Sequence, residues 1–238
     1  MARLPRLYVP GCSHHIIQRG NNRCACFFEK RDYAFYLQQL DISAKKFGVA
    51  IHAFALMTNH VHLMVTPSEA DSCGNMMQSL GRKYVRYINL TYQRTGSLWE
   101  GRYKSTLVDS DTYCLCLYRY IESNPVRAKM VADPAEYTWS SYRSNALGKH
   151  IKLLTPHPVY TALGSTQAQR LLCYRALFDG EISIQTMDEI RECTNKGWLL
   201  GGDKFKQEIA DHANRRLSSS GWGGDRRSVN YRRQDQGV

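Results

Sequence analysis

The chain has 238 residues, of which 43% are hydrophobic and 22% are charged, a balance typical of a soluble globular protein. Its formal net charge of +11 indicates a polyanionic partner, most simply nucleic acid. No apolar run approaches the ~20 residues that cross a bilayer, and the first residues lack the apolar core of a signal peptide. We therefore expect a cytoplasmic protein with no membrane partner.

Eight cysteines are spread along the chain without any Cys-x-x-Cys spacing. Two Cys-x-Cys pairs, Cys24 with Cys26 and Cys114 with Cys116, could in principle bind zinc, but the usual ligand spacing is absent. Reduced and mostly buried thiols are the better interpretation. A structural zinc protein is therefore a weak alternative.

Hydrophobic periodicity predicts a strand, a helix, two strands, a helix and a strand in the first half of the chain. These elements are a strand at 8–19, a helix at 30–47, strands at 49–57 and 60–66, a helix at 72–94 and a strand at 105–108. The order is that of a ferredoxin-like or RRM-like α+β fold. Such a fold has an antiparallel sheet with helices on one face, and we expect the other face to be free for nucleic acid.

The second half of the chain is predicted to be helical. A third helix should run from Ser110 or Asp111 to about Asn124, where Pro125 disfavours continuation. We expect a catalytic or binding domain at 1–150, a linker at 151–158, a small C-terminal helical appendage at 159–217 and a basic disordered tail at 218–238. The appendage contains three helical patterns, at 165–178, 186–195 and 203–217, the second opened by a capping box of Thr186 and Glu189.

Two histidines lie in the strand that follows the Thr58-Asn59 turn. Because side chains at i and i+2 project from one face of a strand, His60 and His62 should stand side by side. Two parallel imidazoles can share one metal ion. Two surface histidines at the mouth of a hairpin are the alternative.

Tyr120 and Asn124 lie one turn apart on the packing stripe of the third helix. Tyr120 by itself reads as a core tyrosine. A side-chain amide on a packing stripe must find hydrogen-bond partners, because leaving it unsatisfied costs a desolvation penalty of about 1–3 kcal/mol. A metal ion, or the groups around one, would supply partners for Asn124.

Two basic segments are candidates for contact with a phosphate backbone. Arg19, Asn21 and Arg23 belong to a polar turn, and Arg82, Lys83 and Arg86 lie off the apolar stripe of the second helix. A plain polar turn and a solvated helix face are the respective alternatives.

Five short stretches occur in a recognisable order: HIIQRGNNR at 15–23, LMTNHVHL at 56–63, GRYKS at 101–105, YRYIESNPVRA at 118–128 and YTWSSYR at 137–143. Each is weak alone, but the ordered set, which covers roughly residues 1–148, is specific. The set resembles the single-tyrosine transposases of the HUH superfamily, and most closely their REP-associated branch. That family has a ferredoxin-like sheet with helices, in agreement with the pattern above.

The resemblance implies roles for four residues. His60 and His62 would be metal ligands, Tyr120 the nucleophile and Asn124 the third ligand, one helical turn after the tyrosine. Ser123 stands where the family is expected to have a larger residue, a departure that leaves these roles intact. The mixed nitrogen and oxygen donors suit Mg²⁺ or Mn²⁺.

The implied activity is metal-dependent cleavage and rejoining of single-stranded DNA near REP-type hairpins through a 5′-phosphotyrosine intermediate. The protein would act as a monomer or a homodimer. Candidate DNA-binding residues are Arg19, Asn21, Arg23, Arg82, Lys83, Arg86, Arg102, Lys104 and Arg127. The alternative is a non-catalytic nucleic-acid-binding module of RRM-like fold, for example a domesticated hairpin binder.

Overall fold

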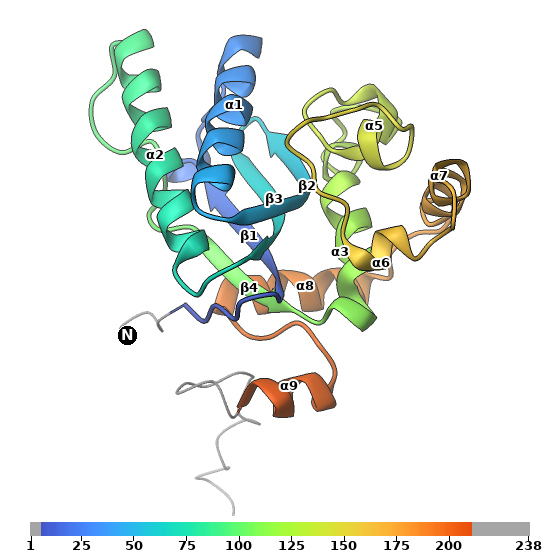
Figure 1. Ribbon diagram of the computed structural model, residues 1–238. Coiled ribbons are helices and arrows are strands. Elements are labelled where there is room, and N and C mark those ends of the chain that lie inside the picture. The colour runs from blue at the N-terminus through green and yellow to red at the C-terminus, as the bar shows by residue number, and fades with distance from the viewer. Residues whose placement is uncertain (1–5, 211–238) are drawn as a thin grey trace, which may run out of the picture.

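The computed structural model describes residues 6–210 (Figure 1). The predicted basic tail at 218–238 and the end of the predicted helix at 203–217 lie outside these residues. Within the described range, no helix combines the length and apolar character needed to cross a membrane.

The centre of the molecule is a four-stranded antiparallel sheet (Figure 1). Its strands are β1 (Ser13–Arg19), β2 (Val49–Met57), β3 (His60–Pro67) and β4 (Lys104–Val108), in the order β2-β3-β1-β4. This is the ferredoxin-like arrangement, so the predicted α+β class is confirmed. The first strand begins later than predicted because Gly11, at φ +75°, turns the chain just before it.

The remaining elements are helices, most of them after β4. They are η1 (Asn21–Arg23), α1 (Lys30–Lys46), α2 (Ser72–Thr91), α3 (Ser110–Glu122), α4 (Asn124–Arg127), η2 (Pro134–Glu136), α5 (Tyr142–Asn145), α6 (Pro158–Thr161), α7 (Gln167–Ala176), α8 (Ile184–Lys196) and α9 (Asp203–Ala210).

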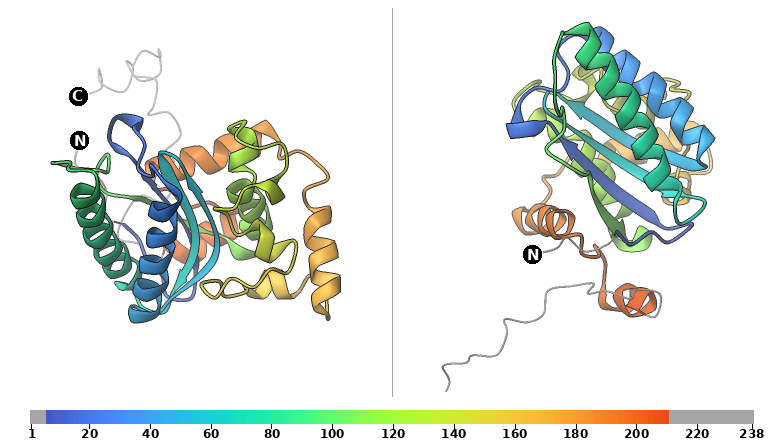
Figure 2. Two further views of the ribbon diagram at one scale, coloured as in Figure 1. Left: turned by 90° about the horizontal axis from the view of Figure 1, so that it is seen from above. Right: turned by 90° about the vertical axis from the view of Figure 1, so that its left-hand side faces the viewer.

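Helices α1 and α2 cover one face of the sheet side by side (Figure 2). The buried Asp32 carboxylate of α1 ties them together. It accepts hydrogen bonds from the backbone amides of Phe28 and Glu29 and from the hydroxyls of Tyr87 and Tyr92, at 2.8–2.9 Å. A buried carboxylate with four donors is well compensated for its lost hydration.

The other face of the sheet is not free, contrary to the sequence-based expectation. Its side chains include four buried apolar residues, Ala53, Ala55, Met64 and Val108. Because such a surface is unfavourable in water, it packs against helices: α3 contacts β2 and β3, and α8 contacts β4 and β1. Figure 2 shows the sheet between these two helical layers. Nucleic acid can therefore reach this face only where the covering helices leave an opening.

The predicted third helix continues past Pro125 with only a small interruption. Helix α3 ends at Glu122, and α4 starts at Asn124 with the proline in its first turn. Proline is tolerated there because the first amides of a helix have no partner within the helix. Tyr120 and Asn124 thus lie on either side of the junction between α3 and α4.

The segment predicted as a linker packs on the sheet. The Thr155 amide donates to the Ile51 carbonyl at 2.8 Å, and Nε2 of the buried His157 lies 3.0 Å from the Ser13 hydroxyl. The division at 151–158 remains a prediction, but the residues after it are fastened to those before it. Tyr174 of α7 adds to this by donating to the buried Glu122 carboxylate at 2.7 Å.

Helix α8 begins two residues earlier than predicted. Its N-cap is Ser183, whose hydroxyl accepts from the Thr186 amide at 3.1 Å. The predicted capping box of Thr186 and Glu189 is therefore wrong. Glu189 instead accepts a hydrogen bond from the Tyr113 hydroxyl of α3 at 3.0 Å, which joins the two helices of this layer.

Removal of the Asp32 carboxylate should destabilise the protein substantially. Asp32→Ala leaves two amides and two tyrosine hydroxyls without their acceptor, and we expect a loss of about 2–4 kcal/mol in the free energy of unfolding, measured by urea titration. Asp41→Ala is the control, because its pair with Lys45 on the surface of the same helix should contribute less than about 1 kcal/mol. Equal losses for the two variants would contradict this account of the α1–α2 contact.

Candidate active site

Strand β3 presents two imidazoles toward the layer that contains α3 and α8. The ring centroids of His60 and His62 lie 5.0 Å apart, as expected for i and i+2 on one strand face. Nδ1 of His60 lies 2.6 Å from Oδ1 of Asn59, and Nδ1 of His62 lies 3.0 Å from Nε2 of His15. Each Nδ1 therefore has a partner within the protein, and Nε2 is the ring nitrogen left for a ligand.

Both imidazoles are held in the neutral form. Burial lowers the pKa of His60 to about 4, and the nearby positive charges of Arg19 and Arg127 act in the same direction. Burial also lowers the pKa of His62 well below its usual value, with further contributions from His15 and His60. A neutral imidazole keeps a lone pair and can bind a metal ion.

Tyr120 of α3 faces the two histidines. Its ring lies 5.9 Å from the His62 ring and 5.9 Å from the His15 ring, edge-on to both. The Arg127 guanidinium lies over the tyrosine ring, 4.2 Å from its centroid. Burial lowers the pKa of Arg127, and its charge interaction and hydrogen bond with Tyr120 oppose this shift. The tyrosine thus lies between an imidazole pair and a guanidinium.

The partners expected for the Asn124 amide are protein groups around the pocket. Its Nδ2 donates to the carbonyls of Tyr120 and Ile121, at 2.9 and 3.2 Å, and its Oδ1 accepts from Arg127 Nη2 at 2.7 Å. The first two bonds fix the orientation of the amide. A carbonyl oxygen has two lone pairs, so Oδ1 keeps acceptor capacity while Arg127 is bound.

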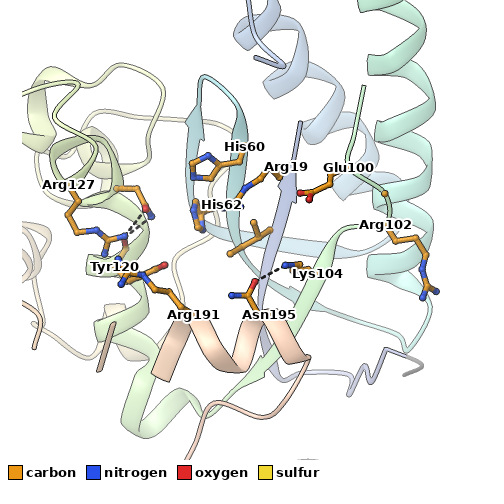
Figure 3. A pocket seen from close by; sticks show the side chains of 13 residues that line it. Arg19, His60, His62, Glu100, Arg102, Lys104, Tyr120, Arg127, Arg191 and Asn195 are labelled. Atoms are coloured by element: carbon orange, nitrogen blue, oxygen red, sulfur yellow. Dashed lines mark hydrogen bonds between the residues drawn. The ribbon is translucent and has the colours of Figure 1, made fainter. Parts of the chain in front are cut away.

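These residues line one pocket of about 350 Å³ (Figure 3). The lining residues are Ile17, Arg19, His60, His62, Glu100, Gly101, Arg102, Lys104, Tyr120, Asn124, Arg127, Arg191 and Asn195. Five of them are cationic and one is anionic, so the pocket attracts anions. In Figure 3, Arg19 lies beside the histidines, whereas the Arg102 side chain points away from them.

The other predicted DNA-binding residues do not line this pocket. Asn21 and Arg23 are exposed in η1, beyond the end of β1. Arg82, Lys83 and Arg86 are exposed on α2, which covers the opposite face of the sheet. Their contact with DNA stays a prediction.

Sequence reasoning missed the part of the site that α8 supplies. Arg191 and Asn195, four residues apart on that helix, line the pocket, and Asn195 Oδ1 accepts from Lys104 Nζ at 2.6 Å. Nothing near them in the sequence indicates a site, because their place depends on how α8 packs on the sheet. His15 was also missed, although strand alternation would have put it on the same face as Arg19.

Residues 8–124 match the family model described as "Transposase IS200 like". No curated protein sequence matches the chain. A solved REP-associated tyrosine transposase bound to a REP hairpin is similar, with a TM-score of 0.55 and 15% identity over 67% of this chain and 93% of that chain. This similarity concerns the fold. A provisionally assigned transposase from Deinococcus radiodurans matches 51% of this chain and 96% of its own at 21% identity, with a TM-score of 0.36.

The family match spans just under half of the chain, and that part contains His60, His62, Tyr120 and Asn124. It supports a single-tyrosine transposase of the IS200-like type, and the solved transposase shares the fold.

Proposed function

We propose that the protein cleaves and rejoins single-stranded DNA next to hairpins, in a reaction that needs a divalent cation and passes through a 5′-phosphotyrosine. The main support is one juxtaposition. The Tyr120 ring lies 5.9 Å from the His62 ring, and the His62 ring lies 5.0 Å from the His60 ring, in a pocket that all three line.

The donors in the pocket fit Mg²⁺ or Mn²⁺. Nε2 of His60, Nε2 of His62 and Oδ1 of Asn124 would hold the ion, with the remaining positions left for phosphate oxygens and water. Within residues 6–210, no group of three or more His, Cys, Asp and Glu side chains is placed to hold a metal ion, so we assign the third protein ligand to the Asn124 amide. When bound there, the cation would polarise the scissile phosphate and offset its developing negative charge.

Tyr120 would be the nucleophile. Its phenol oxygen forms a bond to phosphorus while the bond from phosphorus to the 3′ oxygen breaks, and the phenolic proton ends on the released 3′ oxygen. The products are a 5′-phosphotyrosine and a free 3′-hydroxyl, so attack by a 3′-hydroxyl reverses the step without an external energy source. Arg127, already in contact with the Tyr120 ring, places a positive charge beside the reacting groups.

The basic lining of the pocket suits a DNA backbone. Arg19 and Lys104 extend from the sheet, while Arg127 and Arg191 extend from the helices opposite (Figure 3). Guanidinium and ammonium groups on both walls can contact successive phosphates of one strand. The likeness in fold to a transposase bound to a REP hairpin favours a hairpin next to the cleaved strand.

Loss of the Tyr120 hydroxyl should abolish the covalent intermediate. With hairpin-bearing single-stranded DNA and Mn²⁺, the wild-type protein should give an adduct that survives denaturing electrophoresis, whereas Tyr120→Phe should give none, because the attacking oxygen is missing. Tyr118→Phe is a matched control on the same helix, with its ring against Tyr160 and Tyr174 on the other side.

Three outcomes have distinct meanings. An adduct that persists in Tyr120→Phe would mean that another residue is the nucleophile. DNA binding without any adduct in the wild-type protein, with either cation, would favour the non-catalytic module. The proposal is supported if the wild-type protein and Tyr118→Phe form the adduct and Tyr120→Phe does not.

Arg19 should contact a phosphate of the bound strand. Removing one such contact reduces the magnitude of the slope of log affinity against log salt concentration by about 0.7 for single strands. We expect this reduction for Arg19→Ala in fluorescence anisotropy titrations with Tyr120→Phe as the background. Arg82→Ala, on the opposite side of the sheet, should leave the slope unchanged; the reverse result would place the strand on α2 instead.

A further inference from the structure

A buried chain of hydrogen bonds connects His62 to helix α8. Nδ1 of His62 lies 3.0 Å from Nε2 of His15, and Nδ1 of His15 lies 3.0 Å from the hydroxyl oxygen of Thr194. The Thr194 hydroxyl in turn donates to the Ile190 carbonyl at 2.7 Å. His15, His62 and Thr194 are each at most 3% exposed, so water does not compete for these bonds.

The direction of these hydrogen bonds is set by the shorter contact of the Thr194 hydroxyl, which lies 2.7 Å from the Ile190 carbonyl and 3.0 Å from Nδ1 of His15. The Thr194 hydroxyl has one hydrogen, and it donates this hydrogen to the Ile190 carbonyl. In its hydrogen bond with His15, the hydroxyl oxygen is therefore the acceptor. Nδ1 of His15 therefore carries the hydrogen of that ring. A neutral imidazole has one N–H, so Nε2 of His15 is an acceptor, and the hydrogen between the two rings belongs to Nδ1 of His62. It follows that Nε2 of His62 has its lone pair free.

His60 reaches the same state by a local route. Asn59 Nδ2 donates to the Arg23 carbonyl at 2.9 Å, which leaves Asn59 Oδ1 as an acceptor for Nδ1 of His60. The turn before β3 thus sets the tautomer of one histidine, whereas the tautomer of the other depends on a helix more than 120 residues further along the chain.

We propose that Thr194 is a positioning residue that, through His15, holds His62 in the tautomer that binds the catalytic cation. This inference rests on the proposed function of His60 and His62. Thr194 lies in α8, outside residues 8–124, where the family match ends. The C-terminal helices are then a working part of the site, and the catalytic unit extends beyond the predicted boundary at residue 150.

The tautomer of His62 matters because cation binding needs the lone pair of its Nε2. If His62 took the other tautomer, Nε2 would point an N–H at the cation and could not bind it. Partners that orient a ligand in this way typically account for 10–100-fold in metal affinity.

Thr194→Val and Thr194→Ser test the proposal. Valine keeps the shape of threonine but has no hydroxyl, whereas serine keeps the hydroxyl. With the full chain and no DNA, we expect Mn²⁺ affinity measured by calorimetry to fall about 10–100-fold in Thr194→Val and to be retained in Thr194→Ser. Nitrogen-15 NMR of the histidine rings should show a hydrogen on Nδ1 of His62 in the wild type and Thr194→Ser, and a mixture of tautomers in Thr194→Val.

His15→Leu gives an independent check if Thr194→Val folds poorly. It removes the acceptor of His62 directly and should cause a similar loss of affinity. Thr194→Val and His15→Leu interrupt the same series of hydrogen bonds. The variant with both changes should therefore bind Mn²⁺ no more weakly than His15→Leu alone. Additive losses would overturn the proposal.

Wild-type Mn²⁺ affinity in Thr194→Val, or an unchanged His62 tautomer, would also overturn it, even if the melting temperature falls. If the wild-type protein binds no Mn²⁺ at His60 and His62, the proposed metal site fails. The NMR comparison then still decides whether α8 sets the tautomer of His62, so the two failures are distinguishable.

Discussion

The need to cover both faces of one antiparallel sheet determines where the site forms. The strands carry buried apolar side chains on either side, and neither face can be left in water. Helices α1 and α2 cover one face, and α3 with α8 covers the other. The pocket is the opening that remains in the second layer, where β3 turns its two histidines toward α3. The same packing that completes the core therefore brings Tyr120 to the imidazoles.

Within this opening, polar groups are fixed before any substrate arrives. Nδ1 of each histidine is already bonded, the Asn124 amide is oriented by the carbonyls of its own helix, and Arg127 lies on Tyr120. Burial keeps the imidazoles neutral, and the surrounding guanidinium groups reinforce this. Such preorganisation favours a charged reaction centre because little needs to move when negative charge develops on a phosphate.

Much of this could be predicted from local sequence patterns, and the rest could not, for physical reasons. Strand alternation predicted that His60 and His62 share a face, and helical periodicity placed Tyr120 and Asn124 on one stripe. The covering of the second sheet face was missed because the alternation of apolar and polar residues in a strand indicates which positions are buried. It does not indicate which helix packs on them. The part played by α8 was missed for the same reason: Thr194 has no local signal, and its role depends on long-range packing.

The account depends on a cation between the two histidines with the tyrosine beside it. Anomalous X-ray diffraction from crystals soaked in Mn²⁺ tests this most directly. We predict a peak bonded to Nε2 of His60 and Nε2 of His62, on the side of the pocket that faces Tyr120. A peak bound elsewhere, or no peak at these nitrogens while DNA is still cleaved, would contradict the central claim.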